Sequence, residues 1–416
     1  MCVRCHHVAR LESLIKATQL LNSTLDLDEL LGVIQQQVLA NLQAARCTIY
    51  LIDAARGELW SRVLKDSKLV EIRLPLGTGI AGHVAQTGET VNLRDAAQDA
   101  RFFADFDRRT GFHTRTMLCT PMRNRAGATI GVFQMLNKKS GPFTRSDEVF
   151  LHAFSDQVAL AIENARHHQA VVEKERAEKE LQIAARIQES LLPRETVTLP
   201  GYALCASTRP CHMVGGDYYA VVPLPAGRLL IVVADVAGKG VPAALLVSML
   251  HAALHVRLDG ALELCSLAAR LNEFMYANVI PGRYITFFAG LLDGARHQIT
   301  TVNAGHPGPR LVGGGGLTAL NAGGLPLGLL PGSAYQSETT PLAPGDLLVL
   351  FSDGLTEAEN GNEIEYGEER LEDCLRACAG LSADAAHARV LDDAHQFAGG
   401  MPLRDDLTLM VLHRQA

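Results

Sequence analysis

The feature that most limits how this chain can fold is a charged helical stretch near its middle. Residues 173–180 are charged at every position except Ala177. A helix that is polar on all sides has no face to bury, so it connects domains instead of lying inside one. The following residues 181–187 restore an apolar stripe, and Pro193 ends the helix. We therefore predict a helical, coiled-coil-like linker at residues 166–195, with a domain on either side.

The residues before the linker show the pattern of one α/β domain, at residues 23–165. Asp26 and Glu29 resemble a capping box that opens a helix. Short β-like runs divided by turn residues then follow at 47–52, 59–64, 70–74, 90–93, 117–122 and 129–136. A closing helix from Asp147 to about Ala165 completes the domain. Its inward positions are expected to be Val149, Phe150, Ala153, Phe154, Val158, Ala161 and Ile162.

The residues after the linker predict a second and larger α/β domain, at residues 196–416. Its strands are expected at 229–234, 285–292, 298–302 and 347–351, and its helices at 242–256, 261–279 and 382–397. The chain has 416 residues, of which 48% are hydrophobic, so each of two domains can bury a sizeable core.

The charge and the cysteine content exclude several classes of protein. Asp and Glu number 45 against 38 for Lys and Arg, so the net charge of -7 provides no basic surface for nucleic acid. The 9 cysteines are irregularly spaced, which favours free thiols in a reducing cytoplasm. Residues 1–10 lack the apolar core of a signal peptide, and no stretch is apolar for long enough to cross a bilayer. We expect a soluble cytoplasmic protein with no nucleic-acid or membrane partner.

Acidic residues recur where apolar runs of the second domain start or end. These are Asp217 after two glycines, Asp235 and Asp353 at the ends of runs, and Asp405 and Asp406 before another run. A single Asp at a strand end is normally a turn former, but neighbouring strands would gather several of them at one end of a sheet. Cations would relieve their repulsion there, and carboxylates without Cys or His ligands favour magnesium or manganese. Two such ions would neutralise four carboxylates and activate a water for attack on phosphorus.

Several stretches of the second domain together resemble the metal-dependent protein phosphatase (PPM) family, in its SpoIIE/RsbU branch. They are residues 214–219, 235–244, 303–306, 351–358 and 404–408, in the order of that family. The resemblance implies a β-sandwich flanked by helices, so that the whole chain has an α/β (α+β) fold class. It also implies that Asp235 bridges two divalent cations, manganese or magnesium. By the same resemblance, Asp217 and the Val236 carbonyl hold one ion, Asp353 and Asp405 hold the other, and the four Asp form the catalytic site.

Other residues near these stretches carry weaker signals. Residues 182–193 match the linker of that branch, whereas Ala220 stands where relatives often carry another carboxylate, a departure that would weaken one ion. His306 lies near the site by resemblance, and a structural hydrogen bond of its ring and a catalytic role are both open. Cys211 and His212 precede the two glycines, but a soft thiolate suits an oxygen-ligated ion poorly.

The first domain resembles a GAF sensor module. The resemblance rests on residues 77–82 and on Asn137-Lys138 followed by Phe143 and Asp147-Glu148. That last spacing is similar to the pattern of GAF domains that bind cyclic nucleotides. The alternative is a scaffold, in which an ion pair of Lys138 with Asp147 and the packing of Phe143 fix the closing helix. The resemblance implies a small-molecule ligand, whose identity the sequence does not reveal.

These interpretations combine into one hypothesis, a bacterial-type signalling phosphatase. By resemblance, its substrate is phosphoserine or phosphothreonine on a regulatory protein of the anti-sigma-factor antagonist type, and the GAF domain regulates turnover. The alternative is a catalytically silent sensor or scaffold that keeps a GAF ligand site. The acidic set argues against this alternative, because gathered carboxylates cost desolvation and repulsion.

The helical segments outside the two domains predict self-association. An apolar stripe at 11–21 predicts an N-terminal helix, at residues 1–22, and a further stripe continues from Asp147 to Leu192. A stripe that continues through a charged linker needs a partner surface, and a second copy of the chain is the nearest candidate. We therefore expect a homodimer through these helices, with sensor occupancy changing how they pack.

Overall fold

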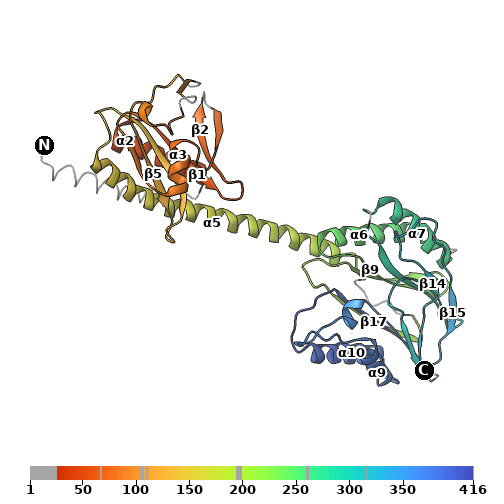
Figure 1. Cartoon of the computed structure of the whole chain (residues 1–416). Coiled ribbons are helices and arrows are strands. Elements are labelled where there is room, and N and C mark those ends of the chain that lie inside the picture. The colour runs from red at the N-terminus through yellow and green to blue at the C-terminus, as the bar shows by residue number, and fades with distance from the viewer. Residues whose placement is uncertain are drawn as a thin grey trace. The chain divides into compact units, whose positions relative to one another are not determined.

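The computed structural model describes residues 26–65, 68–103, 107–108, 111–193, 199–258, 262–280, 282–314 and 316–415. The chain forms two compact units that divide between Ala177 and Glu178 (Figure 1). The N-terminal helix expected at residues 1–22 lies outside the described residues. Among the described helices, none combines the length and the apolar content that crossing a membrane requires.

The first unit is built on one antiparallel sheet. Its strands pair in the order β3-β2-β1-β6-β5-β4. Their bounds are β1 Ala44–Asp53, β2 Glu58–Lys65, β3 Lys68–Pro75, β4 Val91–Leu93, β5 Met117–Arg123 and β6 Thr129–Lys138. The strands expected from the sequence in this unit are confirmed, because β-like runs bounded by turn residues are a strong local signal.

Helices cover both faces of this sheet. α2 (Leu27–Leu42) begins after Asp26, whose side chain accepts a hydrogen bond from the Glu29 amide, as the capping pattern predicted. α2 and the first part of α5 (Arg145–Glu189) pack on one face, and α3 (Gly79–Thr87) packs on the other. A short 3-10 helix, η1 (Ala96–Gln98), follows β4.

α5 is one helix where the sequence suggested a closing helix and a separate linker. It continues without a break through the charged stretch, where residues 167–180 are exposed as predicted. Two positions expected to face inward are wrong, because Val149 is 59% exposed and Ala153 is also exposed. Phe150 and Phe154 are buried, and each wrong position precedes one of them, about 100° away around the helix.

The second unit contains two sheets, which we name the β9 sheet and the β16 sheet. The first has the order β14-β11-β10-β9-β8, with β15 paired to β11, and the second has the order β13-β12-β16-β17-β7. The β9 sheet comprises β8 Asp217–Leu224, β9 Arg228–Val236, β10 Ile285–Asp293, β11 Gln298–Ala304, β14 Gly323–Gly324 and β15 Glu338–Pro341. The β16 sheet comprises β7 Tyr202–Arg209, β12 Arg310–Gly313, β13 Gly316–Ala319, β16 Leu347–Phe351 and β17 Leu407–Arg414.

The two sheets form a sandwich with a helical layer outside each sheet (Figure 1). Apolar side chains such as Ile231, Phe288 and Met410 fill the space between the sheets. α6 and α7 cover the β9 sheet, and α9 and α10 cover the β16 sheet. The helices are α6 Val241–Val256, α7 Leu264–Asn278, α8 Asp353–Thr356, α9 Glu368–Arg376 and α10 Ala383–Ala398. This is the helix-flanked β-sandwich that the resemblance implied.

Candidate functional site

Two of the predicted acidic residues lie opposite each other in the β9 sheet. Asp217 is the first residue of β8, and Asp235 is the residue before the end of β9. The antiparallel register pairs them directly. Pairing of this kind places the start of one strand beside the end of the next, so two carboxylates far apart in the sequence come together.

The other two belong to the β16 sheet. Asp353 opens α8 immediately after β16, and Asp405 precedes β17, which pairs with β16 from Phe351↔Leu409 onward. The sequence analysis expected all four carboxylates at one end of one sheet, and that expectation is wrong. The structure distributes them in two pairs over two sheets, because strand order in the sandwich separates β8 and β9 from β16 and β17.

Hydrogen bonds hold the two pairs together across the sandwich. The Asp217 Oδ2 atom accepts hydrogen bonds from the Ser352 hydroxyl at 2.7 Å and the Thr408 hydroxyl at 2.6 Å. The Thr408 amide in turn donates to the Ser352 hydroxyl oxygen at 2.8 Å. Both residues stand inside the stretches that carry the resemblance, but sequence reasoning missed their role. Their contact with Asp217 depends on the packing of one sheet on the other.

The pKa shifts show how strongly these carboxylates affect one another. Burial and the charge of Asp235 raise the pKa of Asp217 well above its ordinary value. Burial and the charges of Asp353 and Asp405 raise the pKa of Asp235 to about 7. Burial and Asp405 also raise the pKa of Asp353. The four predicted carboxylates therefore form one electrostatically coupled cluster.

The donor set of this cluster fits divalent cations. The Oδ1 atom of Asp217 is buried and has no hydrogen-bond partner among the described residues. A Cβ atom at Gly216 would lie 3.1 Å from the Val236 carbonyl oxygen and 3.3 Å from Asp235 Oδ1, so only glycine leaves these oxygens open. Carboxylate and carbonyl oxygens in this number are the ligands that magnesium and manganese prefer.

Asp406 has a different task from its neighbour Asp405. Its carboxylate accepts hydrogen bonds from the backbone amides of Cys211, at 2.7 Å, and Gly216, at 2.5 Å. It is only 2% exposed, and a Cβ atom at Gly215 would lie 2.7 Å from its Oδ2 atom. Asp406 therefore positions the loop that leads into Asp217.

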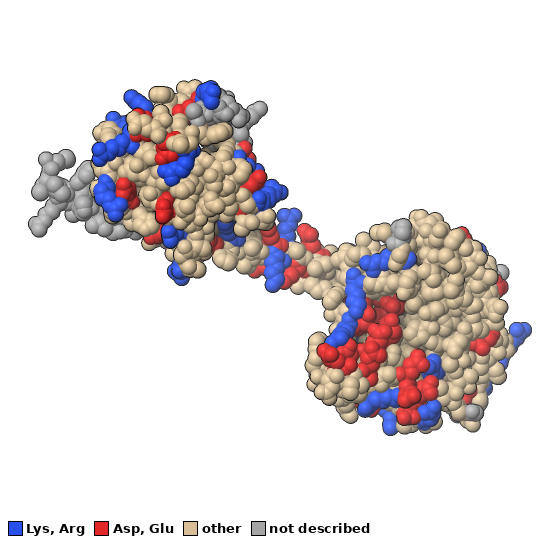
Figure 2. Space-filling model, in the orientation of Figure 1, with Lys and Arg blue, Asp and Glu red and all other residues tan. Residues whose placement is uncertain are grey.

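Two charged side chains at the cluster were not singled out in the sequence. The Lys239 ammonium lies 2.8 Å from a carboxylate oxygen of Asp405 and is 40% exposed. Burial, Asp353 and Asp405 raise the pKa of Glu357. Figure 2 shows acidic side chains gathered on one face of the second unit, with Lys and Arg side chains beside them. The cluster thus has a surplus of negative charge, with the Lys239 ammonium group at its edge.

The structure shows the surroundings of His306 and Cys211, which carried weaker signals in the sequence. His306 is buried, its Nδ1 lies 2.9 Å from the Thr286 hydroxyl, and burial lowers its pKa to about 3, so the ring is neutral. The Cys211 sulfur lies within 4.8 Å of carboxylate oxygens of Asp405 and Asp406. Burial and Asp406 raise the pKa of this thiol to about 11, which keeps it protonated and a poor ligand.

Ala220 does not face the cluster. It is 3% exposed and packs with Tyr218 and Val232 in the core under α6 and α7. Asp217 lies three residues earlier on the same strand, and side chains at odd spacing point to opposite faces of a sheet. A carboxylate at position 220 would enter an apolar core, so the expectation that its absence weakens an ion is wrong.

The end of α5 contacts the loop before Asp217. The Gln188 side-chain amide donates to the Gly215 carbonyl at 2.7 Å, and the Gly215 backbone amide donates to the Gln188 side-chain oxygen Oε1 at 3.0 Å. Gly215 is therefore held on one side by this helix and crowded on the other by Asp406. Gln188 stands within residues 182–193, the stretch that matches the linker of the branch, but sequence reasoning assigned it no contact with Gly215.

In the first unit, the residues of the sensor-like pattern support the fold. Lys138 forms an ion pair with Asp147, which is 0% exposed and also accepts hydrogen bonds from the Thr144 amide and hydroxyl. Phe143 is buried, and its carbonyl accepts a hydrogen bond from Asn92. The ion pair and the packing of Phe143 that the sequence predicted for the closing helix are therefore confirmed.

Comparisons with known proteins agree with both units. Residues 225–415 match the family model described as Stage II sporulation protein E (SpoIIE), and residues 26–162 match the model of the GAF domain. The SiaA-PP2C domain of Pseudomonas aeruginosa is a structure of similar fold, with 23% identity and a TM-score of 0.53 over 58% of this chain and 98% of that chain. The chain thus combines a GAF domain with a SpoIIE-type domain of the metal-dependent protein phosphatase (PPM) class.

Two curated relatives are similar over a shorter stretch. They are "Probable 3',5'-cyclic phosphodiesterase pde-5" of Caenorhabditis elegans and "Dual 3',5'-cyclic-AMP and -GMP phosphodiesterase 11A" of Takifugu rubripes, each 35% identical over 158 and 159 residues. The matches cover 35% of this chain but 21% and 18% of those proteins. The chain therefore spans about a fifth of the length of these relatives.

The raised pKa values predict an unusual pH dependence of stability. The folded protein without metal binds protons on Asp217, Asp235 and Asp353 more tightly than the unfolded chain does. Its free energy of unfolding should therefore fall as the pH rises from 3.8, the ordinary pKa of Asp235, to its folded value of about 7. Urea unfolding in a chelator checks this fall, and saturating magnesium or manganese should remove it. Asp235→Asn should flatten the curve, and an unchanged slope in that variant would contradict the assignment.

Proposed function

We propose that the protein is a metal-dependent serine/threonine protein phosphatase. The observation that carries the proposal is the coupled carboxylate cluster at the junction of two sheets in a SpoIIE-type domain. Asp217, Asp235, Asp353 and Asp405 are the proposed catalytic and metal-binding side chains, with the Val236 carbonyl as a further ligand. The odd-numbered set of cysteines supports a reducing, cytoplasmic setting.

Each residue of the cluster has a separate part in this proposal. Two divalent cations, manganese or magnesium, supply a nucleophilic water and neutralise the phosphate charge when bound. Asp235 would be a ligand of both cations, because its carboxylate is coupled to the carboxylates of both sheets. Ser352 and Thr408 fix one oxygen of Asp217 and thereby aim the other at the cluster. Lys239, at the exposed edge, is suited to attract an anionic phosphoester.

The proposed substrate is phosphoserine or phosphothreonine on a regulatory protein of the anti-sigma-factor antagonist type. The SpoIIE match supports this class of substrate. An acidic cluster whose charge would be neutralised only by its metals, with Lys239 at its exposed edge, also suits a phosphorylated side chain presented on a protein surface. The rival function is a catalytically silent sensor or scaffold with the same fold. It predicts no turnover of any phosphoester at any metal concentration.

Asp235→Asn tests the phosphatase proposal directly. The amide removes the charge that holds two cations close together, so manganese-dependent turnover of a generic phosphoester should fall by at least about a hundredfold. Folding should survive, because Asn relieves the repulsion that raises the pKa of Asp235. Asp373→Asn, on α9, is the control and should keep full activity, because this side chain is 78% exposed and pairs with Arg376, outside the cluster. A folded Asp235→Asn variant with wild-type turnover would overturn the assigned role.

For regulation, we propose that a small molecule bound to the GAF domain acts through α5 on the loop before Asp217. Support comes from the continuity of α5 up to Glu189 and from the paired hydrogen bonds between Gln188 and Gly215. Gly215 contacts this helix, and Gly216 lies beside the Val236 carbonyl and the Asp235 carboxylate, which would hold the cations. A shift of the helix end would therefore move the backbone that lets those oxygens converge.

Gln188→Ala should release this loop. Loss of two hydrogen bonds, worth together about 1–2 kcal/mol, predicts roughly tenfold faster amide exchange at Gly215. Hydrogen–deuterium exchange with mass spectrometry of the full chain measures it, together with phosphoester turnover. Gln182→Ala, an exposed glutamine on the same helix, is the control and should change neither. Unaltered exchange at Gly215 in the Gln188 variant would contradict the proposed contact.

We also propose that the chain is a homodimer through its linker. Ile183 is 59% exposed and Ile187 is 58% exposed on α5. A single chain would leave these apolar side chains in water, and a second copy of the helix would cover them. Changing both to Glu should halve the mass that light scattering measures for the full chain. Ile364→Glu, at a site 57% exposed outside α5, should leave the dimer intact. A wild-type protein with the mass of one chain would refute the proposal.

A further inference from the structure

A cavity of about 720 Å³ lies between α9 and α10, on the outer face of the β16 sheet. Its lining includes Arg370, Arg389, Asp393 and Cys374. None of these residues belongs to the carboxylate cluster. The cavity therefore brings a thiol and two guanidinium groups together at a place that the proposed phosphatase reaction does not use.

A second thiol lies next to the first. Cys378 follows Cys374 by four residues and is 0% exposed, and the two thiols are close enough to shift each other's pKa. Both are free thiols. Cys374 thus lines the cavity, whereas Cys378 is buried in the apolar core between the helices and the β16 sheet.

The surroundings favour a reactive Cys374. The neighbouring Cys378 thiol, the charge of Arg389 and the Tyr366 hydroxyl lower the pKa of Cys374, against the opposing effects of burial and Asp393. The Cys374 sulfur and burial raise the pKa of Cys378, which stays protonated. The thiolate is the nucleophile in sulfur chemistry. Cys374 is therefore the thiol suited to attack first, and Cys378 is the thiol suited to react second.

We propose that Cys374 and Cys378 form a hydroperoxide-reactive dithiol site in the α9–α10 cavity. The Cys374 thiolate attacks one oxygen of the hydroperoxide, the O–O bond breaks, and the other oxygen leaves as an alcohol or water after taking a proton. Cys374 is thereby oxidised to a sulfenic acid. The Cys378 sulfur then attacks that sulfur, the S–S bond forms, and the hydroxyl group leaves with the Cys378 proton as water. The hydroperoxide is reduced, and the two thiols become one disulfide.

The position of the pair at a helix end permits closure. Helix neighbours four residues apart have Cβ atoms about 5–6 Å apart, and a disulfide needs about 3.5–4.5 Å. α9 ends at Arg376, so Cys378 lies beyond the helix, where the backbone can adjust. Inside the helix such an adjustment would break the regular hydrogen bonds.

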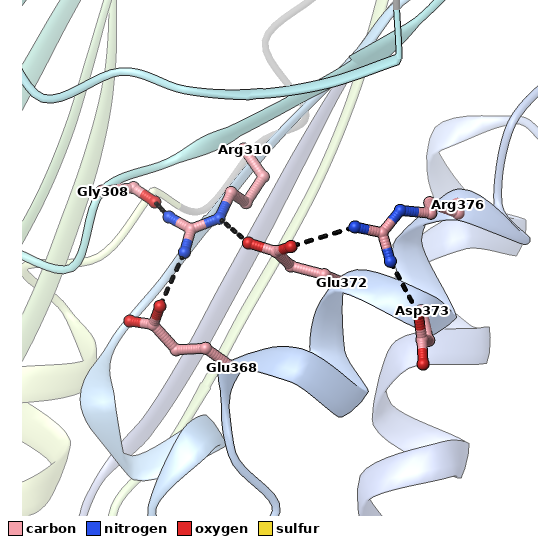
Figure 3. Close-up of polar contacts among 6 residues, drawn as sticks. All are labelled: Gly308, Arg310, Glu368, Glu372, Asp373 and Arg376. Carbon is pink, nitrogen blue, oxygen red and sulfur yellow. Dashed lines mark hydrogen bonds and ion pairs between the residues drawn. The ribbon is translucent and has the colours of Figure 1, made fainter.

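The same helix anchors a buried arginine (Figure 3). Arg310 has a 7% exposed side chain and binds Glu372 at 3.1 Å and Glu368 at 2.9 Å, both on α9, and it also donates to the Gly308 carbonyl. Glu372 is bound in turn by Arg376 at 3.1 Å. A disulfide at the end of α9 would thus form on a helix that contacts the segment directly after His306.

The test treats the full-length protein with hydrogen peroxide, blocks the remaining thiols and maps cysteine pairs by mass spectrometry. An intramolecular Cys374–Cys378 disulfide is expected. In Cys378→Ser, dimedone should trap Cys374 as a sulfenic acid at least about tenfold faster than it traps Cys265. In Cys374→Ser, Cys378 should stay reduced. Cys265→Ser, a half-buried thiol on α7, is the control and should leave the disulfide unaffected.

Two results would overturn the proposal. One is a wild-type protein in which both thiols stay reduced at a peroxide dose that oxidises Cys265. The other is a Cys378→Ser variant whose Cys374 reacts with dimedone no faster than Cys265. Thermal unfolding of each variant shows whether it is folded, and the wild-type measurement decides the question even if a variant is not. Phosphatase activity is not needed as a readout, so the outcome is independent of the proposed function.

Discussion

Repulsion between buried carboxylates is the constraint on which the second unit depends. Asp217, Asp235 and Asp353 all have raised pKa values, so the fold holds these groups together at a cost. The hydroxyls of Ser352 and Thr408 partly offset that cost for Asp217 and tie the β9 sheet to the β16 sheet at this point. Burial of the apolar side chains between the two sheets and under the outer helices offsets the rest of this cost.

The loop before Asp217 shows how closely backbone and ligands must approach. Gly215 and Gly216 leave room for Asp406, for Asp235 and for the Val236 carbonyl, and any Cβ atom there would crowd them. Asp406 holds this loop from the β16 side, and Gln188 holds it from α5. The geometry of the candidate site is therefore set by residues that do not face the cluster as ligands.

α5 has firm attachments at both ends. In the first unit it begins beside the buried Lys138–Asp147 ion pair, and in the second unit it ends on Gly215. Between these attachments its surface is charged and exposed, so the helix is stabilised there by its own backbone and by side chains in water. The described contacts of α5 with the rest of each unit are therefore concentrated toward its two ends.

The sequence by itself determined the local features of this protein. The predicted strands, the Asp26 cap and the Lys138–Asp147 pair follow from patterns within short stretches, and the order of motifs identified the class of phosphatase. The tertiary structure alone decided that the carboxylates come from two sheets, that Ala220 faces the core, and that Cys374 lines a cavity while Cys378 is buried in the core. The physical reason is that periodicity reports which face of a strand or helix is apolar, whereas strand pairing and sheet packing join residues far apart in the sequence, such as Asp217 and Thr408, which are 191 positions apart.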